Sequence, residues 1–117
     1  MEKGKLQEDL YGNTYQKDES SMESIIQTEK ECFLCGKNGC MDPLENHHVF
    51  GGANRKYSEK YGLKIWLCGD NCHRNGPLSV HRNRAVSYRV KAIGQAKWEE
   101  TYGTREDFIR LFGRNYL

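Results

Sequence analysis

The cysteines and histidines of this chain are the residues whose spacing indicates metal binding, and the cysteines number five. Cys32 and Cys35 are separated by two residues, and Cys68 and Cys72 by three. Two such pairs, each in a turn, are typical of a tetrahedral site in which four thiolates bind zinc. We therefore predict that Cys32, Cys35, Cys68 and Cys72 bind a zinc ion. Four thiolates leave no open coordination position, so this zinc would be structural.

The fifth cysteine, Cys40, could replace one of the four ligands, but it has no partner at ligand spacing. Ordinary buried cysteines and disulfides are the alternatives to a zinc site. The polar residues that follow Met1 do not resemble a secretory signal, which favours a cytoplasmic protein. In that reducing setting cysteines are metal ligands more often than disulfides.

The length of 117 residues suits one domain. The mean hydropathy of −0.87 indicates a small apolar core, which a bound metal ion would help to stabilise. No apolar stretch is long enough for a membrane span, so we expect no membrane partner.

The net charge of +2 conceals an uneven distribution along the chain. Residues 48–98 contain ten Lys and Arg against two Asp and Glu, whereas residues 1–31 contain four against eight. A strongly basic segment favours an anionic partner such as DNA. A solvated surface would explain any single basic residue equally well. The residues expected to bind nucleic acid are Arg55, Lys56, Lys60, Arg74, Arg82 and Arg84.

Two short strands are expected to position the cysteines and histidines. Residues 1–28 are polar and predict a flexible tail with at most a turn of helix near residue 25, so that the domain would comprise residues 29–117. Strands at 45–50 and 63–67 would pair as a hairpin. Residues 53–62 between them predict a basic loop with at most one turn of helix.

Helices are expected in the C-terminal half. Asp70 would cap a short helix over residues 71–75, and a longer helix would begin near Asn83. Thr104 and Asp107 predict a capping box before a final helix. The apolar stripe predicted for the long helix is Val86, Val90, Ile93 and Lys97, the last through its aliphatic stem.

All four histidines lie between residues 47 and 81. His47 and His48 end the first predicted strand, and His73 directly follows Cys72. Adjacent residues of a regular strand face opposite sides, so His47 and His48 share a site only if the strand becomes irregular there. Neutral imidazoles can bind a divalent ion and can deprotonate water near neutral pH. The alternative is that each histidine is an ordinary surface residue.

Three segments, Cys32–Cys35, Asn46–Gly52 and Leu67–Arg74, together resemble the HNH endonuclease family, and more narrowly its small phage and prophage members. The resemblance covers about residues 30–117. It implies an α+β fold of the ββα-metal (His-Me finger) type, with a four-cysteine zinc site and C-terminal helices.

The resemblance also implies roles for the histidines in a DNA endonuclease. His48 corresponds to the general base, and His47 and His73 correspond to ligands of a catalytic ion such as Mg²⁺, Mn²⁺ or Ni²⁺. His81 matches a third ligand more loosely. The middle Asn of the family is absent from residues 61–66, so Asn54 or a backbone carbonyl is expected to orient His48.

Two other classes of protein remain open. A zinc-stabilised module that binds nucleic acid without cleaving it explains the cysteines and the basic residues, but not the converging histidines. A structural virion or assembly protein explains only the cysteines. The sequence does not identify a protein partner from a phage or a host.

Overall fold

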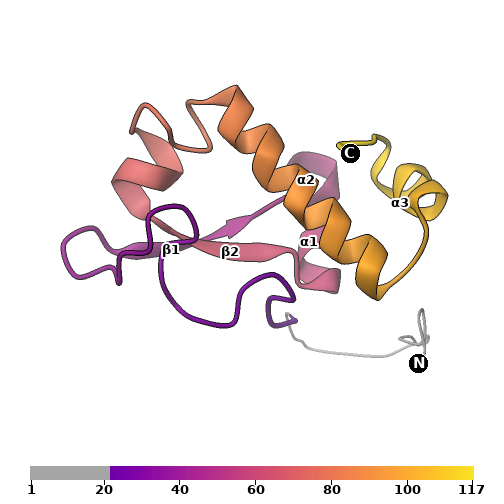
Figure 1. Cartoon of the computed structure of the whole chain (residues 1–117), viewed down its shortest axis with the longest axis horizontal. Helices are drawn as coiled ribbons and strands as arrows, with labels where there is room; N and C mark the ends of the chain where they lie inside the picture. Colours follow the sequence, from indigo (N-terminus) through magenta and orange to yellow (C-terminus); the bar gives the residue numbers. More distant parts are fainter. Residues whose placement is uncertain (1–21) are drawn as a thin grey trace.

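The computed structural model describes residues 22–117, which form a small mixed α/β unit with a two-stranded sheet and helices (Figure 1). The predicted α+β class is confirmed at this level. Residues 1–21 of the predicted tail lie outside the described part. No helix within that part combines the length and apolar composition that a membrane crossing requires. In chain order the elements are β1 (Leu44–His48), η2 (Gly52–Asn54), α1 (Arg55–Tyr61), β2 (Lys64–Cys68), η3 (Gly69–Arg74), α2 (Arg84–Thr101) and α3 (Arg105–Phe112).

The two strands pair antiparallel, with His48 opposite Lys64, as the predicted hairpin requires. The prediction extended the first strand to Phe50, whereas β1 ends at His48. The backbone leaves the sheet because the Ser58 hydroxyl forms hydrogen bonds with both the backbone N–H and the backbone carbonyl of Phe50. The Phe50 N–H donates to the Ser58 hydroxyl, which in turn donates to the Phe50 carbonyl, each at 2.9 Å.

Helix α1 occupies the segment that was predicted as a loop, so that prediction is wrong. Tyr57 and Tyr61 lie one helical turn apart and face the core. The Tyr57 ring centroid lies 5.3 Å from that of Phe112, and the Tyr61 centroid lies 5.8 Å from that of Trp98. Packing of these two rings stabilises a helix whose remaining residues are polar, because tertiary contacts outweigh local propensity in so short an element.

The turn η3 is π-helical, and the predicted cap at Asp70 is wrong. Instead, the carboxylate of Asp42 accepts hydrogen bonds from the backbone N–H groups of Asp70 and Asn71, both at 2.9 Å. A helical turn leaves such N-terminal donors unpaired. These two hydrogen bonds hold the pKa of Asp42 below its usual value.

Helix α2 begins after Asn83, as predicted, and the Asn83 side chain caps it by accepting from the Val86 N–H. The predicted stripe is wrong at Ile93, which is 39% exposed, whereas Lys97 is half-buried. The helix turns Gly94 inward instead, and an added Cβ there would lie 2.9 Å from Cγ1 of Val49. The face that α2 buries is spaced at four residues: Val86, Val90, Gly94 and Trp98.

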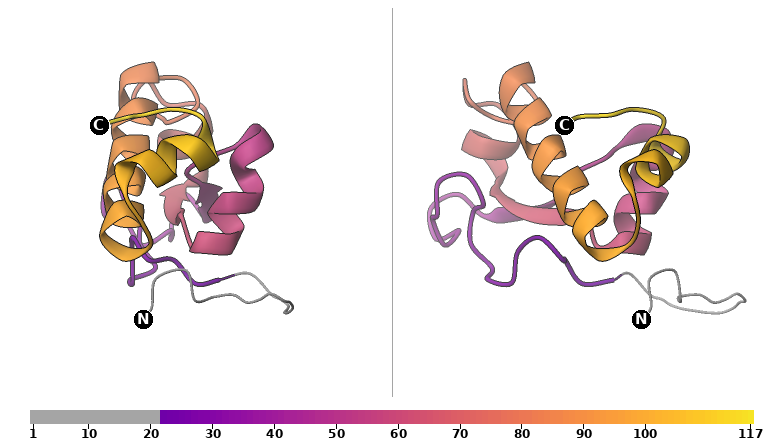
Figure 2. Two further views of the ribbon diagram at one scale, coloured as in Figure 1. Left: turned by 90° about the vertical axis from the view of Figure 1, so that its right-hand side faces the viewer. Right: turned by 45° about the vertical axis from the view of Figure 1, so that its right-hand side comes forward.

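Helix α3 lies between α1 and the C-terminal end of α2 (Figure 2). Thr104 and Asp107 form the predicted capping box at its start. Phe108 and Phe112 of α3 stack at 4.1 Å, and both pack against the ring of Phe50, at 5.6 and 5.0 Å. This aromatic core fixes the chain immediately after β1, where the candidate site begins.

Residues 22–28, which were assigned to the tail, are bonded to the hairpin. The Ile25 N–H donates to the Gly62 carbonyl at 2.9 Å, and the Trp66 N–H donates to the side chain of Gln27 at 2.8 Å. The segment bends at this point and does not form the predicted turn of helix. It extends the described unit on the N-terminal side of residue 29.

Candidate metal centres

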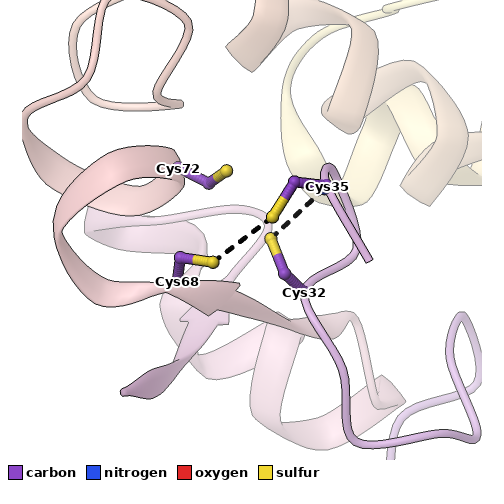
Figure 3. A group of neighbouring side chains, drawn as sticks. All are labelled: Cys32, Cys35, Cys68 and Cys72. Atoms are coloured by element: carbon purple, nitrogen blue, oxygen red, sulfur yellow. Dashed lines mark hydrogen bonds between the residues drawn. The ribbon is translucent and has the colours of Figure 1, made fainter. Parts of the chain in front are cut away.

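Four cysteines from separate segments meet beside the sheet (Figure 3). Their Sγ atoms all lie within 4.8 Å of one another, and those of Cys35 and Cys68 are 3.4 Å apart. Only Cys35 of the four is exposed. The predicted convergence of Cys32, Cys35, Cys68 and Cys72 is therefore confirmed, and the set could hold a metal ion such as zinc. Cys40 is exposed and lies outside this cluster.

A tight turn presents the first cysteine pair. The Cys32 N–H donates to the Lys37 carbonyl and the Gly36 N–H donates to the Cys32 carbonyl, both at 2.8 Å. Gly36 has a φ of 81°, a conformation that favours glycine. The Cys35 N–H points at Sγ of Cys32, 3.4 Å away, so the backbone favours a thiolate at Cys32.

Two of the four sulfurs, those of Cys68 and Cys72, are poorly suited to being thiolates without a cation. Burial, together with the neighbouring Cys35 and Cys32, raises the pKa of Cys68 to about 12. Burial likewise raises the pKa of Cys72. Burial also raises that of Cys32, but backbone hydrogen bonds from Cys68 and Cys35 outweigh it and bring this pKa to about 7. A divalent ion would offset the charge of four thiolates, so the donor set fits zinc.

Three histidines form a second cluster. One ring nitrogen of each of His47, His73 and His81 lies within 4.8 Å of the others. The centroid of His73 is 5.1 Å from that of His47 and 4.7 Å from that of His81. Two backbone hydrogen bonds bring His81 back to η3: Val80 N–H donates to the Cys72 carbonyl at 2.9 Å, and His81 N–H to the His73 carbonyl at 3.1 Å.

The surroundings of His47 and His81 favour neutral imidazoles. Burial lowers the pKa of His47 to about 3, with smaller contributions from His73 and His81. Burial also lowers the pKa of His81. Glu45, two residues before His47 on β1, contacts Nδ1 of His73 at 2.7 Å. Neutral rings with free lone pairs are what a divalent ion needs as ligands.

The histidine cluster faces a cavity of about 370 Å³. This volume accommodates a small anionic group together with water. The lining includes cationic side chains from α1 and α2 as well as the histidines. Among the residues that line the cavity are His47, His48, His73, His81, Arg55 and Lys91.

His48 lines the same cavity but has a different partner from His47. Its Nε2 contacts the carboxylate of Glu59 on α1. The expectation that Asn54 orients His48 is wrong, because the Asn54 amide donates to the Phe112 carbonyl at 2.9 Å. Sequence reasoning missed Glu59 because it missed α1, and a spacing of eleven residues between Glu59 and His48 carries no signal of its own.

The basic residues predicted to bind nucleic acid differ in their relation to this cavity. Arg55 lines it, and Lys91, which was outside the predicted set, lines it from α2. Arg74 is bonded to Glu45 at 2.6 Å, and Arg82 donates to the Asn75 carbonyl at 3.4 Å. The remaining members of the predicted set are exposed on α1 or at the start of α2: Lys56, Lys60 and Arg84.

Comparison of the chain with family models, with curated proteins and with solved structures finds no match in any of the three.

Proposed function

We propose that this chain is a metal-dependent endonuclease of the HNH (ββα-metal) type that hydrolyses phosphodiester bonds in DNA. The observation that carries the proposal is the convergence of His47, His73 and His81 in a cavity that His48 also lines. Three ion ligands beside a candidate base are the parts that phosphodiester hydrolysis needs. The family resemblance of residues 30–117 supports the same reaction.

The four-cysteine cluster would hold zinc in a structural role. Its ligands come from the segment before β1, from β2 and from η3, so the ion joins three parts of the chain. His73 follows Cys72 directly, and His81 is bonded to the backbone of His73. The zinc would therefore hold η3 where its histidine faces β1.

The three histidines would hold the catalytic ion. An ion bound there stabilises negative charge on the scissile phosphate and on the leaving oxygen. Imidazole ligands suit Mn²⁺ and Ni²⁺ better than Mg²⁺, which prefers oxygen. Among the three ions expected from the sequence, we therefore propose Mn²⁺ or Ni²⁺.

The remaining roles belong to residues around the cavity. His48 takes a proton from the attacking water. Arg55 and Lys91 bind phosphate oxygens at the cavity, and the exposed basic residues bind flanking phosphates without reading sequence. DNA binding should therefore weaken steeply as the salt concentration rises.

A plasmid-nicking assay tests the proposal. Wild-type protein should convert supercoiled plasmid to the nicked form with Mn²⁺ or Ni²⁺ and not with a chelator, and His48→Ala should be nearly inactive. Lys97→Ala is the matched control, because Lys97 is a basic residue of α2 that does not line the cavity and forms an ion pair with Glu100. Equal cleavage by wild type and His48→Ala, or none by wild type with any ion, contradicts the proposal.

The rival is a zinc-stabilised module that binds nucleic acid without cleaving it. The exposed basic residues and the cysteine cluster fit it, while the histidine cluster has no role in it. It predicts salt-dependent DNA binding in a gel-shift assay together with no nicking under any metal condition.

A further inference from the structure

The carboxylate of Glu59 joins two residues that face each other across the sheet. One oxygen contacts Nε2 of His48, and the other lies 3.4 Å from Nζ of Lys64. His48 and Lys64 are paired positions in the antiparallel register. A single side chain of α1 therefore holds the end of the hairpin from which His48 projects.

Glu59 is itself held in place by its neighbours on α1. Ser58, the preceding residue, is fully buried and exchanges two hydrogen bonds of 2.9 Å with the backbone of Phe50. Phe50 follows His48 by two residues, so the helix is fastened to the strand end that carries His48. Tyr57 and Tyr61 anchor the same helix in the aromatic core. The core thus fixes the helix from which the partly exposed Glu59 carboxylate reaches the hairpin.

The contacts of Glu59 differ from those of a surface residue in a helix. Arg55 and Lys56 lie one turn earlier on α1, at the spacing where helical ion pairs form. The Glu59 carboxylate is nevertheless directed at the two strand residues. The arrangement matches a carboxylate that orients a functional imidazole through one ring nitrogen and leaves the other to react.

The charge state of Glu59 fits this arrangement. Burial raises the pKa of Glu59, but the hydrogen bond with His48 and the nearby Lys64 ammonium outweigh it, so that the net pKa is lowered. An ionised carboxylate can only accept hydrogen bonds. The Nε2 atom of a neutral His48 must then carry the ring proton, which leaves Nδ1 with the free lone pair.

We propose that Glu59 is the positioning residue of His48: its carboxylate fixes the ring with Nε2 protonated, so that Nδ1 is the nitrogen that accepts the proton of water. The assignment of a base to His48 rests on the proposed function. The tautomer and its dependence on Glu59 do not, because they can be measured without any reaction.

Nitrogen NMR of zinc-loaded, ¹⁵N-histidine-labelled protein measures the tautomer at one fixed, mildly alkaline pH. Wild-type His48 should give the pattern of an Nε2-protonated ring, and Glu59→Ala should give a mixture of both tautomers. Glu100→Ala, which removes an exposed carboxylate from α2, should leave the wild-type pattern. An Nδ1-protonated ring in the wild type overturns the proposal, and so does an unchanged pattern in Glu59→Ala.

Should Glu59→Ala fail to fold, Glu59→Gln keeps the shape of the side chain, and the wild-type tautomer alone still decides. Glu59→Gln should keep the fold but lose part of the preference, because an amide can accept or donate. If the His48 ring in Glu59→Gln keeps the full wild-type preference for the Nε2-protonated tautomer, and this variant nicks at the wild-type rate, the proposed role of the carboxylate charge is overturned.

The kinetic test is a double-mutant cycle on plasmid nicking at saturating metal. Glu59→Ala should slow nicking by about ten- to a hundredfold, with the DNA concentration for half-maximal rate unchanged. In the His48→Ala background the same substitution should not slow nicking any further, because Glu59 acts only through His48. An equal loss in both backgrounds would indicate a merely structural role. If the wild type does not nick at all, the proposed function fails, while the NMR result still decides the positioning claim.

Discussion

The carboxylate of Glu45 lies 2.7 Å from Nδ1 of His73, across 28 residues of sequence. The same carboxylate accepts a hydrogen bond from Arg74 at 2.6 Å. The hydrogen bond from His73 is the main reason why the pKa of Glu45 is lowered, with burial acting against it. An ionised Glu45 can only accept a hydrogen bond, so Nδ1–H of a neutral His73 donates to it and Nε2 keeps the free lone pair. The contact thus ties the tautomer of a candidate ligand to strand β1.

This relationship predicts that Glu45→Gln weakens metal binding at the histidine cluster. Loss of a carboxylate behind a histidine ligand typically costs about 10- to 100-fold in metal affinity. Isothermal titration of zinc-loaded protein with Mn²⁺ or Ni²⁺ measures the change, and Glu100→Gln on the exposed side of α2 is the control. An affinity for Glu45→Gln equal to that of wild type would show that this contact does not prepare His73 as a ligand.

The half-buried His47 makes stability depend on pH. Its folded pKa of about 3 lies below the ordinary histidine value of about 6.5. Below the ordinary value the unfolded chain binds a proton that the folded chain does not, so acidification destabilises the fold. The free energy of unfolding should fall by at most about 1.4 kcal/mol per pH unit in this window.

Substitution of His47 isolates its contribution from that of the cysteines. In His47→Asn the decline between about pH 6 and pH 4 should be shallower than in wild type, as measured by denaturant unfolding at a series of pH values. Parallel curves for the two proteins would show that His47 is not the group responsible.

The first metal centre should control the second. Cys72→Ser should lose zinc. Without zinc, η3 is held less firmly, and the turn that carries His73 and His81 should loosen with it, because the Val80 N–H donates to the Cys72 carbonyl of η3. Metal analysis should show the zinc lost, and titration should show weakened binding at the histidines. Cys40→Ser should retain both. A Cys72→Ser protein that keeps its zinc would remove this cysteine from the site.

Gly94 offers a test of the packing that supports β1. An added Cβ would lie 2.9 Å from Val49 and 3.1 Å from Phe50. The gain in helix propensity from Gly94→Ala is about 1 kcal/mol, whereas overpacking a core costs about 1–3 kcal/mol. We expect a net loss of about 1 kcal/mol in denaturant unfolding. Ala96→Gly at an exposed position of α2 measures the contribution of helix propensity alone. A Gly94→Ala protein more stable than wild type would mean that Val49 and Phe50 shift to accommodate the added Cβ.

Much of the candidate site could be predicted because metal ligands recur at short spacings. The cysteine pairs at Cys32 and Cys68 are local signals, and the hairpin follows from two short segments that end at glycines. Helix α1 could not be predicted, because Tyr57 and Tyr61 are its only aromatic residues and their partners lie in α2 and α3.

Contacts between residues far apart in the chain could not be predicted from the sequence for the same reason. Asp42 caps η3 from 28 residues away, and no pattern distinguishes it from the nearer Asp70. Glu59 reaches His48 only because α1 is packed in one orientation. Local chemistry can be inferred from spacing, whereas the residues that orient the ligands depend on the assembled core.

The nicking rate as a function of metal concentration tests the central claim most directly. His73→Ala should need more Mn²⁺ than wild type to reach half of its maximal rate. His48→Ala should need the same Mn²⁺ but reach a plateau lower by about 10²–10⁴-fold, because it lacks the base and not a ligand. Equal plateaus for His48→Ala and wild type, or a wild-type protein that does not nick plasmid at any Mn²⁺ concentration, would contradict the account.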